Sequence, residues 1–268
     1  MSSQESDSIS ADAKQATGSP TDIAQAGPQG IQPGLVAGPL RMGIVGLLMG
    51  MIAWQLIHWT YPYFEIPEVQ MANPDSPTEE EQRQMGLARF ETGRKDVTVT
   101  GLILGGLAAL LFALVEGISR GGALSTIAIT GISVVLGASL GAVGGYCSMT
   151  FQRAYWFDPS LTAMTREIGI QAIFWIAMAT GVGLGVALYA RRVSLVLGAL
   201  AQTILGAALF VIVYVLLAGL VFPTDSGERT IPYFSANTAV WALLAFGIMG
   251  LMLGLARVRQ KKTTESSA

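Results

Sequence analysis

Very few side chains in this sequence are able to do chemistry. His58 is the only histidine and Cys147 the only cysteine, so the several nitrogen or sulfur ligands of a zinc site cannot be assembled. A single cysteine also excludes a disulfide within the chain. The phosphate-binding, zinc-protease, serine-hydrolase and dithiol motifs do not occur. We therefore expect a protein that is not an enzyme and that holds no metal or cofactor.

The best functional candidates are polar side chains in or beside long apolar stretches: Glu116, Arg120, His58, Gln171 and Gln202. An ionisable group inside a membrane span is a functional candidate by default, and Glu116 is the only carboxylate in such a stretch. The alternative is structural, because Arg120 follows four residues later on the same helical face and could pair with it. His58 lies in an aromatic stretch, where a polar-tipped ring is expected even without a proton-sensing role.

The two glutamines, Gln171 and Gln202, also allow two interpretations. Amides inside a membrane usually form hydrogen bonds between helices, worth roughly 0.6–2 kcal/mol each. A polar permeation path is the alternative. Coupled transport needs a charged or ion-holding site near mid-membrane, whereas Glu116 lies close to one end of its apolar stretch. We expect the glutamines to join helices, and we expect no proton- or ion-coupled transport.

The composition indicates which elements must position these residues. Of 268 residues, 51% are hydrophobic and only 13% are charged, whereas charged residues make up roughly 25% of soluble domains. Six runs without charge are long enough, at roughly 20 residues, to cross a bilayer. The sequence therefore predicts an all-α transmembrane helix bundle with six spans, near 43–61, 97–118, 123–148, 168–190, 194–222 and 237–256.

The remaining segments are polar. Residues 1–40 have too few apolar side chains to order themselves and predict a disordered cytoplasmic tail, followed by a membrane domain over 41–259 and a short tail over 260–268. The only sizeable loop, 62–96, is acidic and predicted to lie outside. Within it, Ser76 or Thr78 followed by the carboxylates of Glu79–Glu81 predicts a short surface helix over roughly 77–92.

Orientation follows the lysines and arginines close to span ends. The clusters Arg191-Arg192 and Arg257–Lys262 lie on the same side as Arg41 and Arg120 when six spans are counted. This pattern predicts a multi-pass protein of the plasma membrane with both termini in the cytoplasm. A net charge of −2 without a basic patch gives no reason to expect a nucleic-acid partner.

Small residues recur every four positions in five of the six predicted spans. The stripes are Gly101, Gly105, Ala109, Ala113 and Gly117 in the second span, Gly137, Gly141 and Gly145 in the third, Ala177, Gly181 and Gly185 in the fourth, Gly46 and Gly50 in the first, and Gly250 and Gly254 in the sixth. Such spacing places them on one helical face, where they let two backbones approach closely. The pattern does not distinguish contacts within one chain from contacts between chains.

The spans also share a hairpin pattern. The first, third and fifth end in aromatic residues and proline, and the second, fourth and sixth are glycine-rich and end in arginine. Three parallel hairpin repeats would explain this, but so would the aromatic and basic ends of any membrane hairpin. We expect a non-enzymatic integral membrane protein that packs through its glycine stripes with itself or with a partner membrane complex; a small-solute transporter or channel is the alternative.

Overall fold

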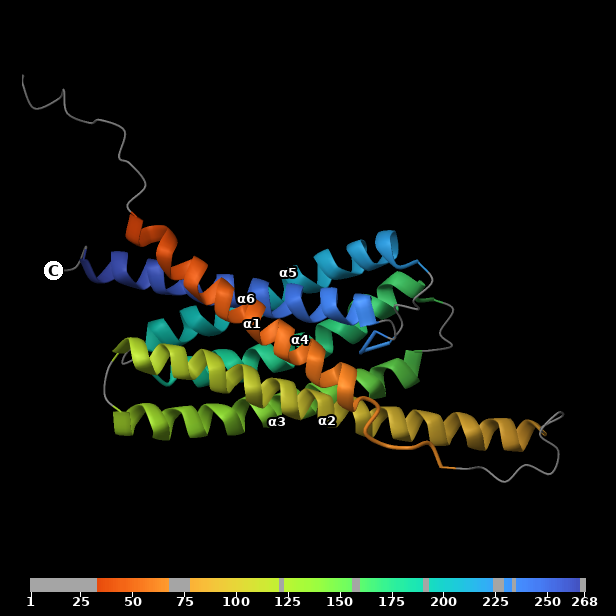
Figure 1. Ribbon diagram of the computed structural model, residues 1–268. Helices are drawn as coiled ribbons and strands as arrows, with labels where there is room; N and C mark the ends of the chain where they lie inside the picture. Colours follow the sequence, from red (N-terminus) through yellow and green to blue (C-terminus); the bar gives the residue numbers. More distant parts are fainter. Residues whose placement is uncertain are drawn as a thin grey trace, which may run out of the picture.

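The computed structural model describes residues 33–67, 78–120, 123–155, 160–189, 193–223, 229–232 and 235–265. These residues contain no strand and form six helices: α1 (Pro33–Thr60), α2 (Glu79–Arg120), α3 (Ala123–Tyr155), α4 (Ala163–Ala187), α5 (Val193–Val221) and α6 (Ser235–Glu265). Each has a stretch long and apolar enough to cross a membrane. The predicted all-α bundle of six spans is confirmed (Figure 1).

The two tails are shorter than predicted where the structure describes them. Residues 33–40, assigned to the N-terminal tail, form the first turns of α1, and residues 1–32 of that tail lie outside the described residues. Residues 260–265 continue α6, and 266–268 lie outside the described residues. The start of α1 and the end of α6 lie at the same end of the bundle, here called the termini end (Figure 1). The opposite end, which holds segments 61–67 and 229–232, is called the loop end.

The second helix is longer than the sequence pattern predicts. Thr78 caps it, because its hydroxyl accepts from the backbone N–H of Glu81 at 3.3 Å while the Glu81 carboxylate accepts from the Thr78 N–H at 2.7 Å. The surface helix expected over 77–92 starts at this cap, but it does not stop before the span. Charged residues do not break a helix, and no proline follows until Pro159, so α2 continues for 42 residues. Its length is therefore about 63 Å.

The helices do not pack as three equal hairpins. Consecutive helices from α2 to α6 are neighbours, whereas α1 packs along α6 and makes few contacts with α2. The long linker between α1 and α2 does not force the two helices together, as short connections do for the others. The first predicted hairpin is therefore open, and α1 crosses the bundle obliquely (Figure 1).

The glycine stripes form the closest helix contacts, and all of them lie within one chain. Between α2 and α3, a Cβ built at Gly105 would collide with the carbonyl oxygen of Gly137, and one built at Gly137 would collide with Gly105. Gly101 and Gly141 face each other in the same way. Gly181 of α4 approaches Gly137 from the other side, at 3.0 Å from the added Cβ to the Gly137 Cα. These helices are thus held at backbone contact.

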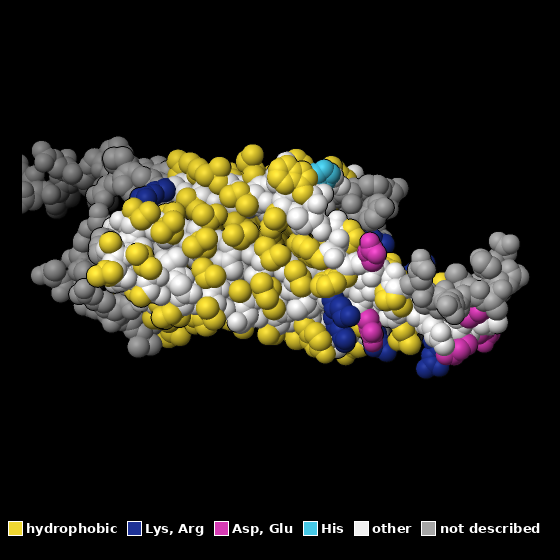
Figure 2. Space-filling model, turned by 60° about the horizontal axis from the view of Figure 1, so that its bottom comes forward, with side chains coloured by type: hydrophobic (Ala, Val, Ile, Leu, Met, Phe, Trp, Pro, Cys, Tyr) yellow, Lys and Arg dark blue, Asp and Glu magenta, His cyan; other side chains and the backbone are white. Residues whose placement is uncertain are grey.

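The other small residues follow the same plan. In α1 and α6, Gly46 and Gly250 meet the backbones of Phe246 and Met42. The remaining stripe residues with an inter-helix neighbour or full burial are Gly50, Ala109, Ala113, Gly117, Gly145, Ala177, Gly185 and Gly254. The sides of the bundle that they leave exposed are apolar, and on the face drawn in Figure 2 the charged side chains gather toward the two ends. This surface suits a bilayer.

We predict that even one methyl group on the α2–α3 face destabilises the bundle. Gly105→Ala places a Cβ on the Gly137 carbonyl and must separate the two helices, at an expected cost of about 1–3 kcal/mol. Gly131→Ala in α3 is the matched control, because a Cβ there meets nothing within 4 Å. The measurement is the melting temperature of the purified proteins in a mild detergent. Equal melting temperatures for the two variants would contradict this packing.

Candidate functional site

A buried glutamine holds the loop end of the bundle together. The amide nitrogen of Gln171, in α4, donates to the carbonyl oxygens of Arg229 at 3.0 Å and Thr230 at 3.1 Å. Its amide oxygen accepts a hydrogen bond of 2.9 Å from the indole nitrogen of Trp241, in α6. The side chain is fully buried. Gln171 therefore makes the kind of inter-helix hydrogen bonds predicted for it, and it also anchors the segment between α5 and α6.

That segment, residues 229–232, is packed into the bundle. Thr230, Ile231 and Pro232 are buried, and the Thr230 hydroxyl lies 3.4 Å from the hydroxyl of Ser148 in α3. The hydroxyl of Thr238, in α6, donates to the carbonyl oxygen of Pro232 at 3.0 Å. A non-helical backbone at this depth needs such partners for its polar groups.

The linker after α1 is fastened by Asp96, near the middle of α2. One carboxylate oxygen of Asp96 accepts from the backbone N–H groups of Tyr63 at 2.8 Å and Phe64 at 3.1 Å. The Asp96 side chain is buried, with a relative exposure of 3%. Burial, together with the Asp96 carboxylate, raises the pKa of the neighbouring Tyr61 to about 12, so its hydroxyl stays protonated at physiological pH.

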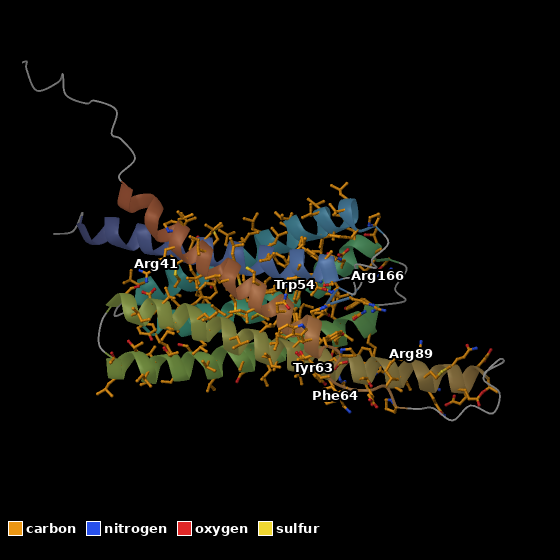
Figure 3. All side chains as sticks on the ribbon, in the orientation of Figure 1. Arg41, Trp54, Tyr63, Phe64, Arg89 and Arg166 are labelled. Atoms are coloured by element: carbon orange, nitrogen blue, oxygen red, sulfur yellow. The ribbon has the colours of Figure 1, made fainter. Side chains whose placement is uncertain are left out.

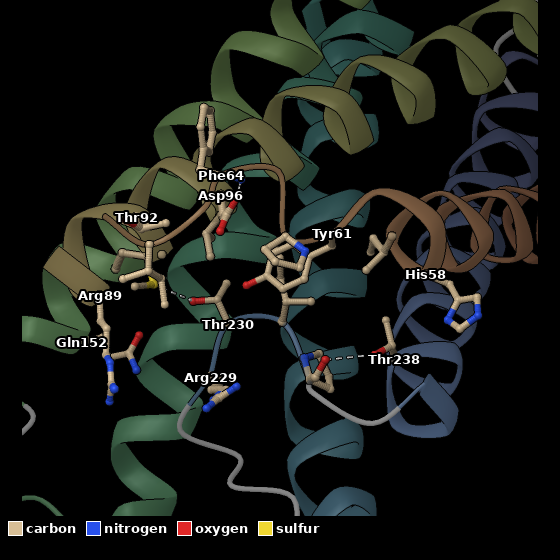
Figure 4. Close-up of a pocket in the computed structure, with 18 of the residues that line it drawn as sticks. His58, Tyr61, Phe64, Arg89, Thr92, Asp96, Gln152, Arg229, Thr230 and Thr238 are labelled. Carbon is tan, nitrogen blue, oxygen red and sulfur yellow. Dashed lines mark hydrogen bonds between the residues drawn. The ribbon is translucent and has the colours of Figure 1, made fainter. Parts of the chain in front are cut away.

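A pocket of about 620 Å³ opens between these elements (Figure 4). Its volume is in the range of about 300–1,000 Å³ that is usual for small-molecule sites. The polar lining consists of His58, Tyr61, Arg89, Thr92, Asp96, Gln152, Arg229, Thr230, Ser235 and Thr238. The apolar lining includes Trp54, Ile57, Phe64, Ile66, Val97, Met149 and Ile231. The pocket therefore combines apolar walls with two guanidinium groups and one carboxylate.

The pocket lies at the loop end. Figure 3 shows Arg89 and Arg166 toward that end of the molecule and Arg41 toward the termini end. Trp54, on the last turns of α1, donates from its indole nitrogen to the Ser235 hydroxyl of α6 at 3.2 Å. In the view of Figure 4, Arg89 and Arg229 lie toward one side of the pocket and His58 toward the other.

Aromatic rings fill the bundle next to the pocket. Trp241 follows the pocket residue Thr238 by one turn of α6, and its ring centroid is 4.7 Å from that of Trp175 in α4. Trp175 also contacts Phe210 of α5 at 5.0 Å and Phe246 of α6 at 5.3 Å. All four side chains are fully buried. These packed rings fill the core between α4, α5 and α6.

The structure does not bring the five predicted polar residues together. His58 lines the pocket and Gln171 lies beside it. Gln202 is half-buried on α5, and Glu116 is buried close to the termini end of α2. Arg120 ends α2, and its side chain lies outside the described residues, so the predicted pairing with Glu116 stays a prediction.

Sequence reasoning missed Arg89, Asp96 and Arg229 as members of one site. All three lie in segments that the sequence predicts as connections between spans, and nothing in their spacing says that a cavity forms between α1 and α2. A weak signal existed, because Asp96 and Arg229 each stand directly beside the start of a charge-free run on the same predicted side.

No family model, curated protein or solved structure matches this chain. In the described part of the chain, no group of three or more histidine, cysteine, aspartate or glutamate side chains could hold a metal ion.

We predict that Gln171→Leu loosens the segment over 229–232. The change removes the partner of the Arg229 and Thr230 carbonyl oxygens and of the indole N–H of Trp241. Each buried polar group left without a hydrogen bond costs about 1–3 kcal/mol. The measurement is hydrogen exchange of peptides covering 229–241. Gln202, in α5, is half-buried, and Gln202→Leu is the control that should leave this exchange unchanged. Equal exchange in wild type and Gln171→Leu would show that the hydrogen bonds of Gln171 (the glutamine clamp) are not needed to hold segment 229–232.

Proposed function

We propose that the protein is a non-enzymatic subunit of a plasma-membrane complex that binds its partner outside the membrane. Both tails are proposed to be cytoplasmic, and the loop end to face outward. The support for this orientation is the position of Arg41 at the termini end and the sequence clusters Arg191-Arg192 and Arg257–Lys262, which favour the cytoplasmic side.

The observation that carries the proposal is the free start of α2. Residues 79–88, here called the arm, extend past the rest of the bundle at the loop end (Figure 1). An isolated helix of ten residues is marginal in water, but the arm is capped by Thr78 and continues into a buried helix. At 1.5 Å per residue it reaches about 15 Å beyond residue 88.

The surface of the arm suits a protein partner. Glu79, Glu80 and Arg83 are exposed, and the Arg83–Glu80 ion pair of 3.7 Å is too exposed to contribute much to stability. Charges of both signs on a rigid element give specificity and fast association. The glycine stripes are already occupied within the chain, so a partner has to bind elsewhere than the sequence pattern suggested.

The pocket favours a second candidate function, a small-solute transporter or channel. A solute-sized cavity with charged groups at one end of a bundle is the entrance that such a protein needs. The packed rings of Trp175, Phe210, Trp241 and Phe246 count against this candidate, because they fill the core between α4, α5 and α6 with apolar side chains. Binding at one face therefore has better support than passage through the bundle.

We predict that the loop end faces outward. With Cys147 replaced by serine, a cysteine in place of Glu80 should react with a membrane-impermeant maleimide in intact cells. A cysteine in place of Thr263 should react only after the membrane is permeabilised. The charges at the span ends are the reason for this expectation. Labelling of position 263 in intact cells would show that the protein has the opposite orientation.

We also predict that the arm contacts a partner. A photo-crosslinking amino acid at Gly86, which has open space around it, should give one discrete product in native membranes. The same amino acid at Leu216, an exposed apolar position of α5, is the control for contacts with lipid or with random neighbours. The product should disappear when Glu79, Glu80 and Glu81 are changed to lysine. No product from Gly86, or an identical one from Leu216, would contradict the proposal.

A further inference from the structure

The pocket at the loop end has a charge pattern that selects its ligand. Of its charged lining groups, the Asp96 carboxylate is buried and one of its oxygens already accepts from two backbone N–H groups. The side chains of Arg89 and Arg229 are exposed where they line the same cavity. An entering molecule therefore meets the guanidinium groups first. Guanidinium is the cation whose planar donors match a carboxylate or a phosphate.

The rest of the lining adds a second requirement. Trp54 and Ile57 of α1 and Ile66 of the linker give the pocket an apolar wall. The wall continues into the apolar surface of the bundle, and Phe64 and Ile66 are more than one-third exposed at its edge. In the face drawn in Figure 2, the charged side chains of the loop end border this apolar surface directly. A molecule that fills the pocket thus touches both arginine and hydrocarbon-like surface.

We infer that the pocket binds an amphipathic anion, with a phosphate or carboxylate head against Arg89 and Arg229 and an apolar body against Trp54, Ile57 and Ile66. Gln152, Thr92 and Thr230 are further polar residues of the same lining. This binding function goes beyond the docking of a protein on the arm and does not depend on it.

The test uses the full chain in dodecyl maltoside micelles, with hexyl phosphate as the probe and calorimetric titration as the measurement. Empty micelles give the blank for partitioning. We expect hexyl phosphate to bind, hexyltrimethylammonium not to bind, and inorganic phosphate to bind far more weakly because it lacks the apolar body. Equal binding of the phosphate and the ammonium compounds would overturn the inference, and so would equal binding of hexyl phosphate and inorganic phosphate.

Variants identify the head group's partners. Arg89→Gln and Arg229→Gln should each weaken hexyl phosphate binding by about tenfold or more, the usual effect of losing a charge-assisted hydrogen bond. The Arg89 side chain is exposed, so Arg89→Gln should weaken binding while it keeps the wild-type melting temperature. Arg83→Gln, on the arm and outside the pocket, is the matched control and should bind as wild type does. If the double variant Arg89→Gln, Arg229→Gln binds as tightly as wild type, the inference is wrong.

The source of the anion is settled by competition. Phosphatidic acid added to the micelles should displace hexyl phosphate if the natural ligand is a lipid with an anionic headgroup. A lack of displacement, with hexyl phosphate binding intact and dependent on the arginines, identifies a water-soluble amphipathic anion instead.

Discussion

The fold depends on the backbone contact between α2 and α3. At Gly101–Gly141 and Gly105–Gly137 no side chain separates the two helices, and Gly181 brings α4 to the same point. With no hydrophobic driving force between helices inside lipid, close packing of small residues has to hold them together. This contact fixes the axis of α2 over its membrane part. Because α2 is one continuous helix, the same contact also sets the direction of the arm and places Arg89 and Asp96 at the loop end.

A second glycine contact determines where the pocket forms. Gly46 and Gly250 draw α1 onto α6, so the helix that precedes α2 in the chain does not pack along it. The two helices come near each other at the loop end, where both line the pocket together with the linker after α1 (Figure 1). Asp96 fastens that linker by accepting from Tyr63 and Phe64. The pocket is thus the space left by unequal pairing of the helices, and its lining comes from segments far apart in the sequence.

Long periodic features could be predicted from the sequence, and local pairing could not. Six apolar runs identify six spans because the bilayer sets their length, and four-residue spacing identifies the packing faces such as Gly101 and Gly105. The choice of partner for each face is not encoded in its own spacing, so the α1–α6 pair and the open first hairpin were not found. The same is true of the site. Gln171 was found from its type and position alone, whereas grouping Arg89 with Arg229 requires the tertiary arrangement.

The distribution of polarity along the bundle favours the proposed binding role over the proposed transport role. Trp175, Phe210 and Phe246 fill the interior near mid-bundle. The ring centroid of Trp175 lies 5.0 Å from that of Phe210 and 5.3 Å from that of Phe246. The hydrogen-bonding capacity of Gln171 is used by Trp241, Arg229 and Thr230, so it is not available to line a route. The exposed side chains of Arg89 and Arg229 line the pocket at the loop end, beside the apolar surface. Opening a passage would require breaking both the aromatic packing and the hydrogen bonds of Gln171. A bundle that is closely packed in its middle and carries charged and apolar groups at one end is therefore suited to bind a partner or ligand at that end.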